Sequence, residues 1–191
     1  MIDALAARIA ALPTRSIVAI SGFAGAGKST LARALVDRVP ATARVRVDDF
    51  LDPARSHRRS PDWDGVDRAR LRAELLDPFA AGETDLAFRP WDWERGRLGG
   101  QVPFGPADRL VVEGIGILHP DLLDLFALTI WIAAEPDDAL ARGLARDRLL
   151  GRDHASLWHE VWVPNDRDFA ARFAPERLAD VVVDPRDIDL A

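Results

Sequence analysis

The chain has 191 residues, a formal net charge of −6 and no cysteine. This length suffices for one α/β domain with a buried core and is too short for two domains of ordinary size, so a single domain over 1–191 is expected. The acidic balance argues against a nucleic-acid partner, which needs a basic surface, and the lack of cysteine excludes disulfides and cysteine-bound metals. No apolar run approaches a membrane span and the first residues lack a signal-peptide pattern, which predicts a soluble, cytoplasmic protein without a membrane partner.

The first predicted elements are a helix over 2–12 and a buried strand over 17–20. The helix has apolar residues at helical spacing, and the strand is a continuous apolar run of the kind found in parallel sheets. A glycine-rich turn and a second helix follow. This turn contains Gly22, four further residues and then Gly27-Lys28-Ser29, which is the complete phosphate-loop pattern.

Each position of the phosphate loop has a physical role in holding a nucleotide. The backbone N–H groups of the turn and the positive end of the helix dipole can bind the β-phosphate. Lys28 is expected to reach the β- and γ-phosphates, Ser29 to bind Mg²⁺ and Thr30 to contact the α-phosphate. Lys28 is the only lysine beside 24 arginines, so the one compact ammonium stands where a phosphate loop needs it. The predicted nucleotide-binding residues here are Gly22, Gly25, Ala26, Gly27, Lys28, Ser29 and Thr30.

A second predicted strand, over 44–47, is followed by two aspartates, Asp48 and Asp49. Ligands of open parallel sheets bind at the carboxyl ends of strands, so a carboxylate here faces the active crevice. Asp48 is the candidate general base that accepts a proton from a substrate hydroxyl as it attacks the γ-phosphate, and Asp49 is the competing candidate. A structural interpretation, in which the pair caps the strand or begins a turn, stays open.

Residues 51–104 are expected to form an excursion on the substrate side of the sheet, with a helix over 67–80 inside it. The stretch 88–97 concentrates two tryptophans, two acids and three arginines. This composition is typical either of a packed aromatic turn or of a flap that stacks on substrate and binds an anion. For the flap, the predicted substrate-binding residues are Asp49, Trp91, Asp92, Trp93 and Arg95.

The next buried strand, over 109–113, again ends in an acid, Glu113. Glu113 is expected beside the phosphate loop, where it would bind Mg²⁺ through water or orient its neighbours. A solvated strand end is the alternative. A short helix over 120–126 and a fourth strand over 128–133 are predicted next.

A long helix after the fourth strand leads into a predicted lid over about 142–155. Arg142 and Arg146 lie on one helical face and Arg152 follows in a turn, so these arginines are expected to close on ATP. Arg142 would bind the nucleotide, whereas Arg146 and Arg152 would neutralise charge on the transferring phosphoryl group. An ordinary solvated face with ion pairs to nearby aspartates is the alternative.

The chain ends in a helical region over 155–173, interrupted near Pro164, and a fifth apolar strand over 179–183. With these elements in place, the sequence resembles the family of uridine kinase, phosphoribulokinase and bacterial pantothenate kinase. The motifs that carry the resemblance are 22–30, 47–50, 90–93, 111–115, 142–153 and 179–183. Together they span nearly the whole chain.

This resemblance implies a P-loop NTPase fold of the α/β class. The fold would be a three-layer sandwich with a five-stranded parallel sheet, helices on both faces and a small helical lid after the fourth strand. The resemblance also implies that Asp48 is the base. The expected activity is phosphorylation of a primary alcohol with ATP and Mg²⁺.

The chain departs from the nucleoside kinases of this family where substrate is recognised. Leu51 stands where they usually have a tyrosine, and Trp91-Asp92-Trp93 replaces their Tyr-Asp-Phe turn. Gly96 falls near the position of their histidine. A nucleoside, as in uridine kinase, is therefore the first guess for the substrate, and another alcohol such as pantothenate or a sugar stays open.

A kinase competes with two other classes of nucleotide-binding protein. A GTPase should contain an Asn-Lys-x-Asp motif, but the only asparagine, Asn165, lies in Asn-Asp-Arg-Asp, which argues against guanine specificity. A non-catalytic nucleotide-binding regulator is expected to lack Asp48, Glu113 or the lid arginines, and this chain has all of them. The leading hypothesis is an ATP-dependent small-molecule kinase, with homo-oligomerisation left open.

Overall fold

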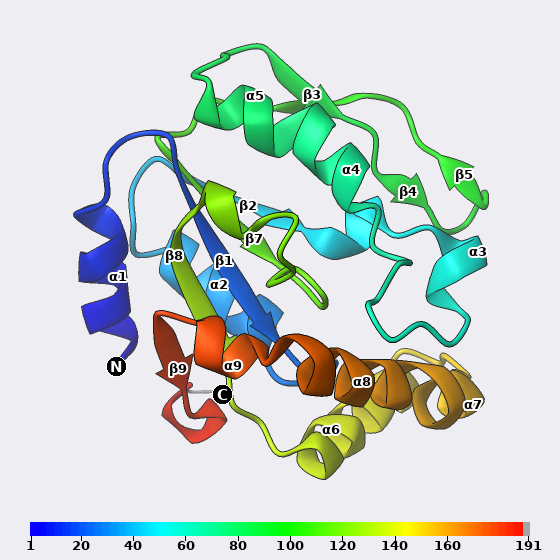
Figure 1. The fold of residues 1–191 in the computed structure, drawn as a ribbon. Helices are drawn as coiled ribbons and strands as arrows, with labels where there is room; N and C mark the ends of the chain where they lie inside the picture. Colours follow the sequence, from blue (N-terminus) through cyan, green and yellow to red (C-terminus); the bar gives the residue numbers. More distant parts are fainter. Residues whose placement is uncertain (189–191) are drawn as a thin grey trace.

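The computed structural model of the chain describes residues 1–188 and has a five-stranded sheet at its centre (Figure 1). The strands lie in the order β2-β7-β1-β8-β9, and every neighbouring pair is parallel. Their bounds are β1 Ser16–Gly22, β2 Thr42–Arg46, β7 Arg109–Glu113, β8 Phe126–Ile132 and β9 Val181–Val183. The predicted parallel sheet of a P-loop fold is confirmed.

The central strand β1 is buried on both faces and divides the apolar core into two clusters. Val18 and Ile20 pack on the side of α1 (Ile2–Ala10) and α2 (Lys28–Val36), whereas Ile17 and Ala19 face the opposite side. This division follows from the alternation of side chains along a strand. An uninterrupted apolar strand is therefore required at this position, as its sequence predicts.

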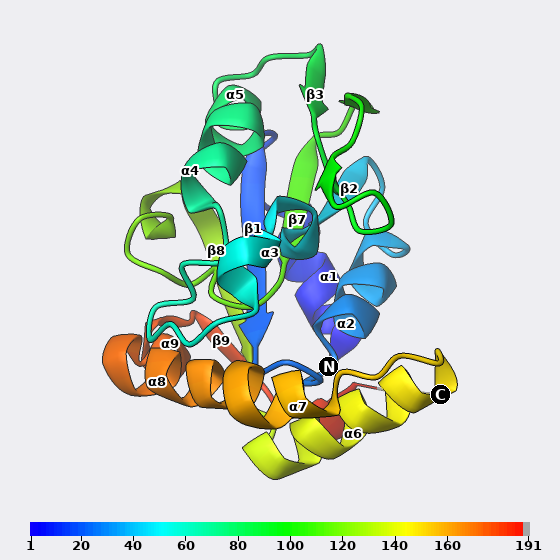
Figure 2. The ribbon, with the colours of Figure 1, turned by 90° about the vertical axis from the view of Figure 1, so that its right-hand side faces the viewer.

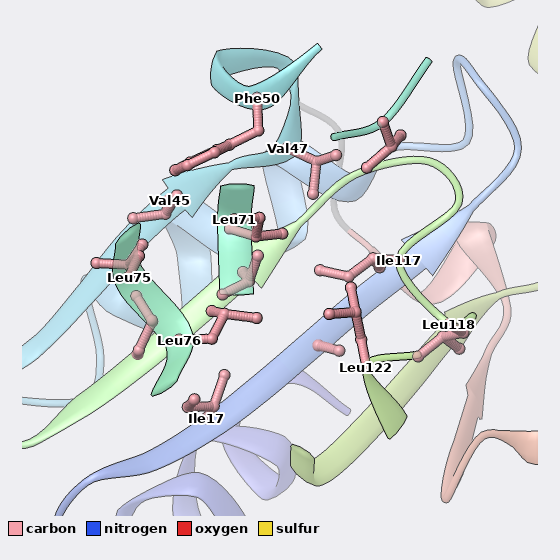
Figure 3. Close-up of a cluster of buried hydrophobic side chains, with 14 of the residues drawn as sticks. Ile17, Val45, Val47, Phe50, Leu71, Leu75, Leu76, Ile117, Leu118 and Leu122 are labelled. Atoms are coloured by element: carbon pink, nitrogen blue, oxygen red, sulfur yellow. The ribbon is translucent and has the colours of Figure 1, made fainter. Parts of the chain in front are cut away.

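The second cluster lies between the sheet and the helical part of the excursion. Leu71, Leu75 and Leu76 pack over the strands together with Ile17 and Val45 (Figure 3). The helical segments that carry these leucines are α4 Arg68–Leu71, a π-helical turn Arg72–Leu76 and α5 Asp77–Ala80. They occupy the stretch predicted as one helix over 67–80.

Two of the predicted helical stretches, 67–80 and 155–173, contain a π-helical turn shortly before a proline. The turns are Arg72–Leu76, which precedes Pro78, and Trp158–Trp162, which precedes Pro164. A proline lacks the backbone N–H and its ring clashes with the carbonyl four residues earlier, which lies inside the turn in each case. The wider turn lets the helix continue past the proline instead of ending there.

The rest of the excursion forms a short helix and two antiparallel ribbons. These elements are α3 Pro53–Ser56, β3 Leu86–Phe88, β4 Trp91–Asp92, β5 Arg97–Leu98 and β6 Val102–Phe104. Strand β3 pairs with β6, and β4 pairs with β5. The predicted flap over 88–97 therefore contains a β-hairpin.

The C-terminal helices lie across the carboxyl ends of the strands in both views (Figures 1 and 2). Their bounds are α6 Pro136–Leu149, α7 Ala155–Leu157, α8 Val163–Phe173 and α9 Pro175–Leu178. The predicted lid, 142–155, corresponds to the second half of α6 and the connection to α7. Within residues 1–188, no helix combines the length and apolar character needed to cross a bilayer.

Several predicted boundaries differ from the observed ones. The second strand ends at Arg46, and the predicted helix over 120–126 is only a 3₁₀ turn, Leu123–Leu125. The last strand begins at Val181, later than predicted, because the side chain of Asp180 binds Thr129 of β8. Its carboxylate accepts hydrogen bonds from the backbone N–H and the hydroxyl of Thr129, each at 2.8 Å, and so caps the edge of β8.

Candidate active site

The phosphate loop connects β1 to α2, and α6 packs directly against it. Gly25 and Gly27 have φ values of +85° and +105°, in the left-handed region that favours glycine. A Cβ atom at Gly25 would lie 2.1 Å from the carbonyl oxygen of Ala139 in α6. Glycine is therefore required both for the turn and for the close approach of α6.

Lys28 is folded back onto this loop and is only 8% exposed. Its Nζ donates hydrogen bonds to the carbonyl oxygens of Gly22, at 2.9 Å, and Phe23, at 2.8 Å. Burial lowers the pKa of Lys28, while the carboxylates of Asp166, Glu113 and Asp48 favour the ammonium and oppose that shift. Three carboxylates thus act on the Lys28 ammonium, and the positive charge of Arg146 acts in the opposite direction.

Ser29, Glu113 and Arg44 form a partly buried polar group beside Lys28. The Ser29 hydroxyl donates to Glu113 Oε1 at 2.9 Å, and Arg44 Nη2 lies 2.5 Å from the same oxygen. Glu113 is 4% exposed and ends β7, between β1 and β2. The structure therefore places Glu113 beside the phosphate loop, and Arg44 is a partner that sequence reasoning missed.

Asp48 and Asp49 lie in a 3₁₀ turn, Val47–Phe50, that directly follows β2. Asp48 Oδ2 accepts a hydrogen bond from Arg46 Nη2 at 2.7 Å. Burial raises the pKa of Asp49, which Arg46 partly offsets. Asp48, unlike Asp49, is among the carboxylates that stabilise the Lys28 ammonium.

The three predicted lid arginines differ in their contacts. Arg142 Nε donates to the carbonyl oxygen of Gly25 at 3.1 Å, and its buried Nη2 has no hydrogen-bond partner in the part of the chain that the structure describes. The Arg146 guanidinium is exposed and lies 3.3 Å from Asp147. Arg152 is exposed, and its backbone N–H binds the carbonyl of Asp147 at 2.9 Å. The structure thus brings Arg142 alone onto the phosphate loop.

The flap residues lie apart from the phosphate loop and interact with one another. The Asp92 carboxylate accepts hydrogen bonds from the backbone N–H groups of Glu94 and Arg95 and from Arg95 Nη1, at 2.9 to 3.1 Å. These hydrogen bonds, the backbone bond from Arg95 first, lower the pKa of Asp92. Trp93 is 49% exposed, and its ring lies nearly parallel to that of His57 at 6.4 Å. Trp91 is half-buried and lines a hollow of about 540 Å³ in the flap.

Asp166 in α8 is a further buried carboxylate at the phosphate loop. Its Oδ2 accepts a hydrogen bond from the backbone N–H of Ala24 at 2.7 Å. Burial raises its pKa to about 6, although Lys28 and the hydrogen bonds act in the opposite direction. Sequence reasoning missed Asp166, because no spacing rule relates it to a loop 142 positions earlier.

Several known proteins are similar to this chain in sequence. No protein-family model matches the chain. The chain is 29% identical over 147 residues to uridine-cytidine kinase C of Dictyostelium discoideum and 29% identical over 168 residues to uridine kinase of Saccharomyces cerevisiae. It is 28% identical over 139 residues to uridine kinase of Halobacterium salinarum. The chain is therefore similar in sequence to these uridine kinases over more than half of its length.

These alignments cover most of this chain but less of its relatives. The alignment with the Dictyostelium protein covers 74% of this chain and 32% of the relative. The corresponding values are 80% and 34% for the Saccharomyces protein, and 68% and 61% for the Halobacterium protein. The chain therefore spans about a third of the length of the first two relatives.

Solved structures share the fold over nearly the full length of this chain. A possible uridine kinase from Bacillus stearothermophilus aligns with a TM-score of 0.73 at 17% identity, over 96% of this chain and 97% of that one. A putative fructose transport system kinase from a Silicibacter species aligns with a TM-score of 0.78 at 23% identity, over 96% and 98%. At these identities the likeness concerns the fold.

The residues at the start of α2 fit a divalent cation of the Mg²⁺ type. Such an ion prefers oxygen ligands and keeps several waters, which a hydroxyl and one carboxylate can hold. Ser29 Oγ in the first turn of α2 and Glu113 Oε1 at the end of β7 lie 2.9 Å apart and provide this pair beside the phosphate loop.

Proposed function

We propose that the chain is an ATP-dependent kinase that transfers the γ-phosphoryl group to a hydroxyl of a small molecule. The observation that carries the proposal is the convergence of Lys28, the Ser29–Glu113 pair and Asp48 on one phosphate loop. Phosphoryl transfer depends mainly on positioning and charge stabilisation, and these residues supply both. The uridine kinase names of three relatives support the same activity.

Lys28 would exchange its present partners for phosphate oxygens. Its Nζ is held by two loop carbonyls, so the ammonium lies beside the proposed anion site. Ser29 and Glu113 would hold Mg²⁺, which when bound neutralises charge on the β- and γ-phosphates. Gly22, Gly25, Ala26, Gly27 and Thr30 would line the phosphate site through their backbone or hydroxyl groups.

Asp48 would accept the proton of the attacking hydroxyl. It follows β2 at the carboxyl edge of the sheet, and its charge reaches Lys28. Asp49 is the competing base, and it would otherwise contact substrate. Burial raises its pKa, which makes Asp49 less readily ionised.

The lid arginines would contribute to different degrees to ATP binding and to stabilising charge on the transferring phosphoryl group. The buried Nη2 of Arg142 lacks a partner within residues 1–188 although its Nε is fixed on Gly25, which suits a nucleotide phosphate as the missing partner. Arg146 and Arg152 are exposed and would have to move towards ATP to act on the transferring phosphoryl group.

A nucleoside is the first candidate for the acceptor, because the three relatives are named uridine or uridine-cytidine kinases. Trp91 and Trp93 could stack on a base, whereas Asp92 and Arg95 would first have to exchange their mutual contacts for substrate. A sugar is the second candidate. It is favoured by the unusual Trp91-Asp92-Trp93 turn and by the likeness in fold to a putative fructose transport system kinase.

A panel of acceptors distinguishes these candidates. ADP release from Mg-ATP is measured with uridine, cytidine, pantothenate, fructose and simple alcohols, with Lys28→Ala protein as the background. Stimulation by one chemical class, absent in Lys28→Ala, is the expected result. Equal ADP release with every acceptor and with none would contradict a kinase acting on these alcohols.

A further inference from the structure

The first turn of α8 carries two adjacent polar side chains that are almost fully buried. Asn165 is 0% exposed and Asp166 is 7% exposed. Buried polar groups are costly unless each is hydrogen-bonded, so their partners indicate what the turn holds in place. Those partners belong to two segments, the phosphate loop and the segment 57–64, which connects α3 towards α4.

Asp166 joins these segments through its two oxygens. Oδ2 accepts the backbone N–H of Ala24 in the phosphate loop at 2.7 Å, and Oδ1 accepts Nε1–H of Trp63 at 2.9 Å. The Trp63 side chain is itself buried and packs over Gly116, where a Cβ would lie 2.9 Å from that of Trp63. This packing therefore restricts the movement of the Trp63 indole towards another hydrogen-bond acceptor.

The side chain of Asn165 binds backbone groups of the same segment, 57–64. Its Oδ1 accepts the N–H of Ser60 at 2.9 Å, and its Nδ2 donates to the carbonyl of Arg58 at 2.9 Å. Arg59 also donates to the Asn165 amide oxygen. Figure 2 shows the connection from α3 to α4 passing close to α8.

We propose that Asp166 is a positioning residue that couples the segment 57–64 to the phosphate loop and so sets the affinity for ATP. The inference rests on the proposed function, since it assumes that the loop binds ATP. Ala24 lies between Gly22 and Gly27, and its peptide orientation is fixed by the carboxylate. A disturbance at Trp63 would therefore reach the phosphate loop through one side chain.

A carboxylate fits this role better than an amide. Both of its oxygens are acceptors, and both face N–H donors. An asparagine at 166 would turn an NH₂ group towards one of those donors and lose that bond. Asp166 also attracts the Lys28 ammonium, so its charge acts on the loop as well as its geometry.

The test compares Mg-ATP affinity, by calorimetric titration, in wild type, Asp166→Asn, Trp63→Phe and the double variant. Affinity should fall about 10-fold in Asp166→Asn and about 3-fold or more in Trp63→Phe, the sizes expected for losing one hydrogen bond to a charged group. The double variant should bind ATP about as well as Asp166→Asn alone, because both changes act through one contact. Trp162→Phe is the matched control, since it removes an indole bond to Ser56 that does not involve Asp166.

Melting temperature separates positioning from simple destabilisation. All variants should melt within about 5 °C of wild type, so that affinity is compared between folded proteins. Full ATP affinity in both Asp166→Asn and Trp63→Phe would overturn the inference, as would equal losses in Trp63→Phe and Trp162→Phe. No ATP binding by wild type would instead overturn the proposed function on which the inference rests.

Discussion

The adjacent residues Asp48 and Asp49 differ in their surroundings, and this difference assigns their proposed roles. Asp48 pairs with Arg46 and stabilises the Lys28 ammonium, whereas burial raises the pKa of Asp49. A base must be ionised and must lie near the phosphoryl group in order to accept the proton. Asp48, whose charge acts on the Lys28 ammonium, is therefore the proposed base, and the raised pKa of Asp49 counts against Asp49.

Asp48→Asn should therefore lower kcat on the order of 100-fold or more and change ATP affinity less than about 3-fold. The amide keeps the size of the side chain but cannot accept the proton from the hydroxyl. Steady-state rates and ATP titration on the same preparation check this, with Asp49→Asn as the matched control. Weakened ATP binding with normal turnover, or a larger loss of kcat in Asp49→Asn, would assign the base elsewhere.

At the scale of elements, α8 docks on the phosphate loop through a buried carboxyl group, and this docking should depend on pH. Burial raises the pKa of Asp166 from its ordinary 3.8 to about 6, and Lys28 is the charge that faces it. The folded protein thus binds this proton more tightly than the unfolded chain. The stability contributed by protonation is present below about pH 4 and is lost as pH rises through 6.

The free energy of unfolding of Asp166→Asn, relative to wild type, should therefore rise by roughly 2 kcal/mol between pH 4 and pH 7. The variant carries no ionisable group at this position, so it escapes the cost of ionising a buried carboxyl. Urea denaturation of both proteins across this range measures the difference. A difference that stays constant with pH, or falls, would show that the carboxyl is not held in the environment described.

Elements whose signals are local in sequence could be predicted, whereas most side-chain contacts between distant elements could not. The position of Glu113 beside the phosphate loop is an exception, because the carboxyl ends of parallel strands share one edge of the sheet. The phosphate loop, β1 and α2 are contiguous, so spacing and apolar pattern were sufficient to place Lys28 and Ser29. The bond of Asp166 to Ala24 joins residues 142 positions apart, and that of Arg44 to Glu113 joins residues 69 apart. Such pairs depend on which strands and helices become neighbours in the fold. The local patterns of a single sequence do not reveal these neighbours.

At the scale of the whole molecule, the fold gathers the proposed catalytic groups at one edge of the sheet. The carboxyl ends of β1, β2 and β7 carry the phosphate loop, the two aspartates and Glu113, and α6 and α8 close over that edge (Figure 1). Strand order β2-β7-β1 makes these three ends neighbours, although β7 is far from the others in sequence. The resemblance to uridine kinases, whose fold this chain shares, anticipated this arrangement.

The most direct test of the central claim is calorimetric titration of wild type and Lys28→Ala with Mg-ATP. Wild type should bind one ATP, and Lys28→Ala should bind it at least about 10-fold more weakly while melting at a similar temperature, because a buried ammonium facing the phosphates is lost. Equal affinity in the two proteins, or no binding by wild type, would contradict a phosphate loop that serves ATP.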